Sequence, residues 1–140
     1  MIDKTKEYSL NELLNIYSLY NIDFKYYGNN NDIKYPDMTI FELINKTAES
    51  YPFNYAYEYY GKKVTYREFI YKIKKCASAL IELGVHEGDR VTICMPNTPE
   101  SFALIYAINK IGAIANIIHP LSSTQDIERA LHETNSSIIF

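Results

Sequence analysis

The chain has 140 residues, of which 47% are hydrophobic and 22% are charged, and its formal net charge is −3. These proportions are ordinary for a globular protein, and they exclude a disordered or collagen-like chain. A chain of this length buries roughly two thirds of the surface that it exposes when unfolded, which is enough for one domain with a real core. Its Lys and Arg residues are scattered along the sequence instead of striped on one face, which argues against a nucleic acid or an anionic membrane as partner.

The two cysteines and the N-terminal residues bear on the cellular compartment. Cys76 and Cys94 fall on apolar faces of different predicted elements, without CxxC spacing or a His partner, so we interpret them as buried, reduced thiols. Residues 1–10 lack the apolar core of a signal peptide, and no apolar run reaches the ~18 residues that a membrane span needs. We therefore expect a cytoplasmic protein without a membrane span.

Five capping boxes mark where helices are expected to begin. In each, a Ser, Thr or Asn caps a backbone N–H, and an acidic or amide residue three positions later reaches back. The pairs are Ser9 with Glu12, Thr39 with Glu42, Thr65 with Glu68, Asn97 with Glu100, and Ser122 with Gln125. Tyr51-Pro52 should end the second helix and Gly84 the third, and Pro99 lies in the first turn of the fourth.

Strand signals fill the intervals between these helices. Residues 54–65 contain two β-prone runs joined at Gly61-Lys62, which predicts a hairpin whose primed turn has Gly first. Further strands are expected at residues 91–95, 113–118 and 136–140, alternating with helices. Such alternation is typical of right-handed crossovers and a parallel sheet covered on both faces. The predicted fold class is therefore α/β, a parallel βαβαβ sheet with covering helices plus a small β-hairpin.

Apolar periodicity separates the helices by depth. The helix at residues 65–83 has one apolar face, made of Tyr66, Phe69, Ile70, Ile73, Ala77, Leu80 and Ile81. In the helix at residues 98–111, apolar side chains including Phe102 wrap most of the circumference, so it should lie deep. Residues 1–38 have less apolar periodicity, which suggests an N-terminal extension before a domain at residues 39–140.

Candidate functional side chains are few. The five glycines, at positions 28, 61, 84, 88 and 112, are not spaced as a phosphate-binding loop requires. His119 is the best single candidate, because it follows the strand at residues 113–118, where open parallel sheets bind their ligands. It has no acidic or nucleophilic partner in the sequence, so a loop role is the simpler interpretation. Helix capping likewise explains Ser122, Ser123 and Thr124 without a nucleophile.

A series of short motifs runs through residues 39–140 in a fixed order. They are Thr65-Tyr66-Arg67-Glu68-Phe69, Gly88-Asp89-Arg90-Val91, Pro96-Asn97-Thr98-Pro99-Glu100, and Lys110-Ile111-Gly112-Ala113 with Asn116. In this order and spacing the chain resembles the N-terminal portion of the adenylate-forming (AMP-binding) superfamily, which comprises acyl- and aryl-CoA synthetases, luciferases and the adenylation domains of peptide synthetases. The resemblance implies that residues 39–140 are an incomplete, N-terminal part of the large synthetase domain.

The end of this resemblance separates the branches of the superfamily. CoA ligases and luciferases typically have Asn-Pro-Leu and then an acidic-Ile pair, whereas amino-acid adenylating domains favour Pro-(Ile/Leu)-Asp. This chain reads His119-Pro120-Leu121 and then Asp126-Ile127, which is similar to the CoA-ligase branch with His in place of Asn. The acyl substrate and its chain length stay open.

For the full-length enzyme, the resemblance implies an acid:thiol ligase that uses ATP, Mg²⁺ and CoA. A carboxylic acid such as a fatty acid would attack ATP to give an acyl-adenylate and pyrophosphate, and CoA would then displace AMP. The family's catalytic and nucleotide-binding motifs have no match in residues 1–140, so no catalytic, cofactor-binding or metal residue is assigned. We expect this piece to be an inactive scaffold that binds no cofactor by itself.

Two alternatives remain open at this point. The chain could be an amino-acid adenylation domain of a peptide synthetase, or a stand-alone binding or assembly module of the same fold. In an isolated fragment, the strands at residues 113–118 and 136–140 would expose a sheet edge and apolar surface. We therefore also expect the fragment to self-associate.

Overall fold

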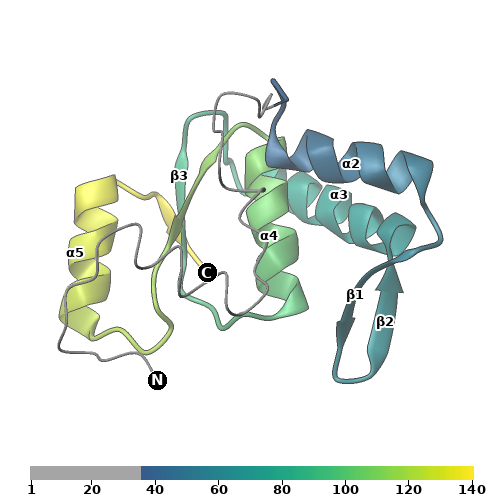
Figure 1. Ribbon diagram of the computed structural model, residues 1–140. Helices are drawn as coiled ribbons and strands as arrows, with labels where there is room; N and C mark the ends of the chain where they lie inside the picture. Colours follow the sequence, from purple (N-terminus) through teal and green to yellow (C-terminus); the bar gives the residue numbers. More distant parts are fainter. Residues whose placement is uncertain (1–35) are drawn as a thin grey trace, which may run out of the picture. The chain divides into compact units, whose positions relative to one another are not determined.

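The computed structural model describes residues 36–140, and the helix predicted to begin at Ser9 lies outside these residues. A compact unit spans Asp37–Phe140. It begins with helix α2 (Ile40–Ser50), a hairpin of β1 (Tyr55–Tyr59) and β2 (Lys62–Thr65), and helix α3 (Tyr66–Glu82) (Figure 1). The βαβαβ run follows, with β3 (Arg90–Ile93), α4 (Pro99–Lys110), β4 (Ile114–Ile117), α5 (Thr124–Thr134) and β5 (Ile138–Ile139). The predicted α/β class is confirmed.

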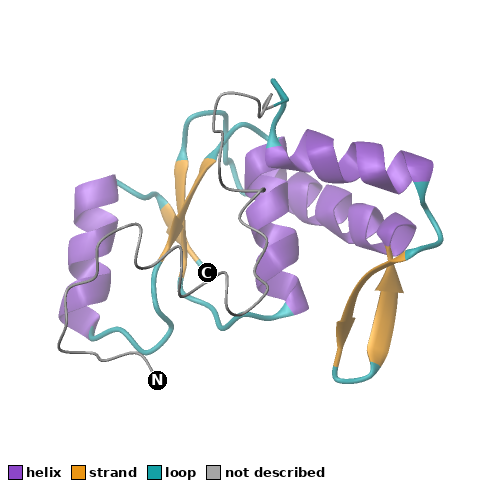
Figure 2. Ribbon diagram, viewed as in Figure 1, coloured by secondary structure: helices purple, strands orange, loops and turns teal. Residues whose placement is uncertain are grey.

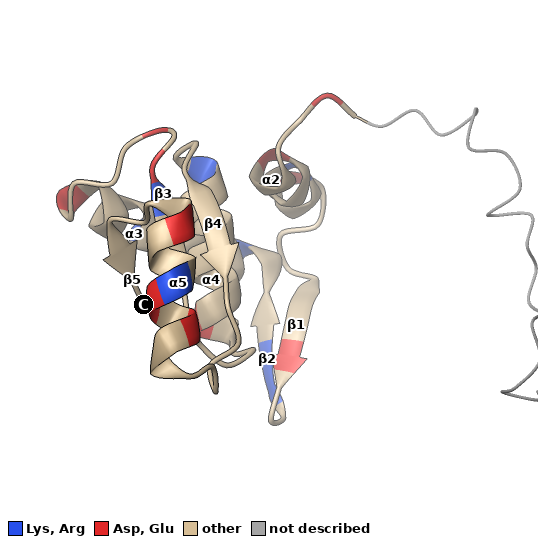
Figure 3. Ribbon diagram, turned by 90° about the vertical axis from the view of Figure 1, so that its left-hand side faces the viewer, with Lys and Arg blue, Asp and Glu red and all other residues tan. Residues whose placement is uncertain are grey.

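The parallel sheet has the strand order β4-β3-β5. Strand β3 pairs with β4 from Arg90 opposite Ile114 onward, and with β5 from Val91 opposite Ile138. In Figures 2 and 3 the strands lie between α5 on one side and α4 with α3 on the other. The sheet is thus covered on both faces, as the alternation of strands and helices predicted, and the hairpin forms a separate antiparallel pair.

The core lies where α3, α4 and the central strand meet. Side chains with at most 1% exposure come from all three elements: Ile73, Leu80, Val91, Thr92, Ile93, Ala107 and Ile108. Helix α4 contacts α2, α3 and β4, so its predicted deep position is confirmed. Two predicted core residues are wrong: Ile81 is 59% exposed and Phe102 is 47% exposed. Each residue follows a buried neighbour by one position, which is about 100° of rotation around the helix axis. The buried face is therefore narrower than the apolar periodicity predicted.

The predicted hairpin is confirmed, but its turn lies one residue earlier than expected. Because Tyr59 pairs with Lys62, the two connecting residues are Tyr60 and Gly61. Both have positive φ, 46° and 78°, which is the signature of a type I′ turn. Gly61 therefore takes the second turn position, and Tyr60 adopts a left-handed conformation that bulky residues rarely accept.

The capping boxes at Thr39 and Thr65 are confirmed. The other two that fall within the described residues are displaced by one position. Helix α4 is capped by Thr98 with Ser101, and α5 by Ser123, whose hydroxyl accepts from the N–H of Asp126. For α4 the reason is Pro99, because the residue before a proline is kept extended and so becomes the cap.

Glu68 should make the stability of the fold depend on pH. Its carboxylate accepts the backbone N–H and the hydroxyl of Thr65, both at 2.8 Å, and these hydrogen bonds lower its pKa. A carboxyl whose pKa is lower in the folded chain stabilises the fold above its unfolded pKa, and this contribution is lost as the pH falls through the folded value. We expect urea unfolding of the Glu68→Gln variant to depend less on acid pH than that of the parent. A Glu82→Gln variant serves as control, and equally steep profiles for Glu68→Gln and the parent would refute the assignment.

The two thiols are free, as predicted, but both are half-buried where burial was expected. Burial raises the pKa of the Cys76 thiol. Cys76 lies at the margin of the buried face of α3, and Cys94 follows the end of β3. Neither side chain is therefore fully enclosed. Within residues 36–140, no helix combines the length and the apolar character needed to cross a membrane.

Candidate functional site

Two hollows flank the start of α4, and the first lies at the carboxyl ends of β3 and β4. It measures about 450 Å³. Its wall is made of Met95, Pro96 and Asn97, which follow β3, and of Ile117, Ile118, His119 and Pro120 at the end of β4. This edge is where open parallel sheets bind ligands, so the hollow is the natural place to look for chemistry.

His119 is exposed at this edge, and its contacts serve the local turn. The ring nitrogen Nδ1 accepts the N–H of Leu121 at 3.1 Å, which leaves the proton of the neutral ring on Nε2. Its carbonyl accepts the thiol of Cys94 at 3.7 Å and the N–H of Ser122 at 3.0 Å. These contacts favour the loop role of His119 over a catalytic one.

The neighbouring polar groups at this edge form hydrogen bonds within the fold. The N–H of Cys94 donates to the carbonyl of Phe140 at 2.7 Å, and the N–H of Ile118 donates to that of Ile93 at 3.0 Å. The hydroxyl of Ser123 donates to the Asp126 carboxylate at 2.6 Å and accepts the Asp126 N–H at 3.2 Å. The sheet ladder and the α5 cap therefore account for these groups without a bound ligand.

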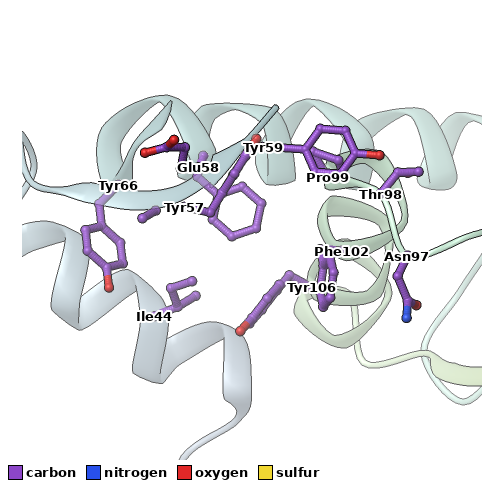
Figure 4. Close-up of a pocket in the computed structure, with 12 residues that line it drawn as sticks. Ile44, Tyr57, Glu58, Tyr59, Tyr66, Asn97, Thr98, Pro99, Phe102 and Tyr106 are labelled. Atoms are coloured by element: carbon purple, nitrogen blue, oxygen red, sulfur yellow. The ribbon is translucent and has the colours of Figure 1, made fainter. Parts of the chain in front are cut away.

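The second hollow is lined by aromatic rings and lies between the hairpin, α2 and α4. It measures about 360 Å³. In Figure 4 the side chains of Ile44, Tyr57 and Tyr106 reach into it from α2, β1 and α4. The ring of Phe69 packs edge-on against Tyr57 and Tyr106, with centroid distances of 5.1 and 5.7 Å. The surface is mostly apolar, which is typical of sites for small hydrophobic molecules and of internal domain contacts.

Sequence reasoning missed this aromatic hollow. The signal that could have indicated it is the run of alternating tyrosines at 55, 57 and 59, which is unusual for a short surface hairpin. The fold brings Tyr57 and Tyr59 beside Phe102 and Tyr106 of α4. No sequence spacing relates these two groups, because they belong to elements about 40 residues apart.

The start of α4 lies between the two hollows, and it is closed to anions. Its first residue, Pro99, has no N–H. The N–H of Ser101 is taken by the Thr98 hydroxyl at 3.4 Å, and the Ser101 hydroxyl accepts the Thr98 N–H at 3.0 Å. Glu100 adds a negative charge to the first turn. A phosphate therefore has little to bind at this helix start, unlike at an open helix N-terminus.

The described residues also offer no metal centre. Between residues 36 and 140, no three His, Cys, Asp or Glu side chains gather closely enough to hold an ion. The donor set that Mg²⁺ prefers, carboxylates with carbonyl oxygens around one point, is not assembled there. The residues present between positions 36 and 140 thus do not fit Mg²⁺.

Comparison with known proteins identifies relatives over most of the described region. Residues 44–140 match the family described as AMP-binding enzyme. The chain is 40% identical over 78 residues to 3-hydroxypropionyl-coenzyme A synthetase of Metallosphaera sedula, covering 56% of this chain and 12% of that protein. It is 28% identical over 108 residues to long-chain-fatty-acid–CoA ligase of Bacillus subtilis, covering 77% of this chain and 19% of that protein. The chain therefore spans less than a fifth of the length of either relative.

Solved structures share the fold. The N-terminal domain of FACL13 from Mycobacterium tuberculosis superposes with a TM-score of 0.70 at 28% identity, covering 73% of this chain and 26% of that chain. A fused adenylation and carrier di-domain, NpsA-ThdA from Klebsiella oxytoca, superposes with a TM-score of 0.71 at 23% identity, covering 75% of this chain and 20% of that chain. At that identity the second likeness concerns the fold alone.

Proposed function

The chain belongs to the AMP-binding enzyme family, and we propose that residues 39–140 form the N-terminal scaffold of an ATP-dependent carboxylic- or fatty-acid:CoA ligase. The main support is its similarity to CoA synthetases and a fatty-acid–CoA ligase, which extends over 108 residues in one case. The His119-Pro120-Leu121 and Asp126-Ile127 pattern points the same way. The reaction would pass through an acyl-adenylate, formed from ATP and the acid, that CoA then cleaves.

In this proposal the described residues organise the domain and take no part in bond making. Strand β3, with three of its residues at most 1% exposed, holds β4 and β5 in register. The capped start of α4 and the turn at His119 fix the edge of the sheet. We assign the binding of ATP, Mg²⁺ and CoA to residues outside 36–140, because the described ones offer neither an open phosphate site nor a cluster of metal ligands.

The test compares two proteins in the same assay. The 140-residue chain should give no acid-dependent ATP–pyrophosphate exchange above background. The complete reading frame that contains it should catalyse exchange with a carboxylic acid and release AMP when CoA is added. Exchange by the 140-residue chain would refute its role as inactive scaffold. Exchange that requires an amino acid and is indifferent to CoA would instead identify a peptide-synthetase adenylation domain, and inactivity of the complete frame would favour a binding or assembly module.

Three finer expectations are part of this proposal. They are a boundary near residue 38 between an extension and the domain, a cytoplasmic location, and self-association of the isolated piece. The last is supported by large exposed side chains near the free edges of the sheet, since Ile114 and Ile117 of β4 are 50% and 59% exposed. Exposed apolar side chains on an edge strand promote association between copies.

A further inference from the structure

Positive charge gathers on the hairpin and the first half of α3. Four cations, Lys62, Lys63, Arg67 and Lys72, border a single hollow of about 490 Å³. The chain as a whole carries a net charge of −3, and acidic residues predominate on α5, far along the chain (Figure 3). The expectation that Lys and Arg are scattered therefore does not hold for this surface, because four of these residues lie within residues 62–72, on β2 and the start of α3.

The nearby carboxylates offset part of this positive charge. Glu68 lines the same hollow, and its carboxylate, which Thr65 holds in the α3 cap, lies close enough to Arg67 and Lys72 to offset part of their charge. Glu58 lies 3.8 Å from Lys63, and both side chains are about half exposed. One such exposed pair is weak, so the hollow presents a net positive surface to an anionic partner.

The tip of the hairpin carries an aromatic side chain that the fold does not need. Tyr60 is 93% exposed and has a φ of 46°. Asn, Asp and Gly accept this conformation in a type I′ turn, whereas a tyrosine is strained there. Its ring packs edge-on against Tyr59 at 4.6 Å, and in Figures 1 and 2 the turn between β1 and β2 points away from the helices. A strained, exposed ring at a projecting tip indicates a contact outside the chain.

We propose that this hairpin tip docks the protein on the surface of an anionic phospholipid bilayer. The amphipathic rings of Tyr59 and Tyr60 match the boundary between headgroups and acyl chains, where tyrosine is enriched. Lys62 and Lys63 follow the turn on β2 and would meet the lipid phosphates, whereas Arg67 and Lys72 lie farther from the tip, on α3. The arrangement suits a bilayer better than a nucleic acid, because the cations surround one point without forming a track along a strand, and the two rings pair with each other instead of forming a platform for successive bases.

The experiment is flotation of the 140-residue chain with vesicles of phosphatidylcholine containing one third phosphatidylglycerol, and with vesicles of pure phosphatidylcholine. The chain should bind the anionic vesicles and lose this binding at high salt. Lys62→Gln with Lys63→Gln should weaken binding about 30-fold, at about 1 kcal/mol for each cation near the surface. The matched control, Lys46→Gln with Arg129→Gln, removes the same charge from α2 and α5 and should bind like the parent.

A second variant separates docking from folding. Tyr60→Asn relieves the left-handed strain, so its melting temperature should equal or exceed that of the parent. The loss of the ring should nevertheless weaken vesicle binding about three- to tenfold. Equal binding to both kinds of vesicle, equal loss in the α2 and α5 control, or binding of a labelled single-stranded oligonucleotide without binding of vesicles would each overturn the proposal.

Discussion

Replacing Ile108 with alanine should lower the free energy of unfolding by about 3 kcal/mol. The side chain is 0% exposed in α4 and shares the core with Ile73 of α3 and Val91 of β3. Its removal takes apolar atoms out of the core and leaves a cavity that three packed elements cannot readily close. Because a domain of this size has roughly 5–15 kcal/mol of stability in total, urea unfolding should show a clear shift of the midpoint.

Two variants control for side-chain size and position. Ile108→Val removes one methylene-sized group from the same site and should cost about 1 kcal/mol. Ile114→Ala removes the same atoms as Ile108→Ala from a position that is 50% exposed, so its cost should stay below about 1 kcal/mol. If the Ile114 and Ile108 alanine variants unfold at the same urea concentration, α4 does not lie in the core. If Ile108→Ala cannot be purified, the valine variant still ranks the two sites.

Local sequence signals predicted most of the fold, because the interactions behind them are local. The boxes at Thr39 and Thr65 each join residues three positions apart, so spacing alone identifies them. The cap of α4 was assigned one residue too early because Asn97 and Thr98 are both good caps. Only the conformational restriction that Pro99 imposes on its predecessor decides between them.

Features that depend on distant elements were harder to predict. The hairpin turn moved to Tyr60 because strand register, set by the pairing of Tyr59 with Lys62, outweighed the preference for glycine in the first turn position. The extent of the core around Ile81 and Phe102 depends on which neighbours cover each helix. Periodicity gives the direction of a buried face but not its width.

The features of the candidate site also divide into those that a general rule predicts from sequence and those that depend on how the elements pack. The hollow at the carboxyl ends of β3 and β4 follows from a rule about parallel sheets, so His119 was placed correctly at that edge. The aromatic hollow combines side chains from elements that are far apart in sequence, so its composition becomes visible only when the hairpin, α2, α3 and α4 are packed together. The cationic hollow, by contrast, is lined by residues 62–72 alone, from β2 and the helix that follows it directly.

Gly112→Ala should destabilise the fold by about 2 kcal/mol, and Gly84→Ala by only about 1 kcal/mol. Both glycines have positive φ, 76° and 84°, so both substitutions incur backbone strain. A Cβ at Gly112 would also lie 2.9 Å from Cγ of Glu87, whereas a Cβ at Gly84 would meet nothing within 4 Å. The Gly112 carbonyl accepts the N–H of Gly88 at 2.9 Å, which holds the two turns together and limits their ability to move apart.

Truncation of Glu87 would remove the contact with a Cβ at position 112 and leave the backbone strain at that position unchanged. In the Glu87→Ala, Gly112→Ala double variant the Cγ is absent, and the remaining Glu87 Cβ position, 3.4 Å away, is near ordinary contact distance. The second substitution should then cost about as much as Gly84→Ala does, close to 1 kcal/mol, when urea midpoints are compared as a double-mutant cycle. Additive effects of the two substitutions would instead mean that the Glu87 side chain swings away freely and that strain at Gly112 explains the whole loss. The cycle therefore measures how tightly the turn before β3 packs on the turn before β4.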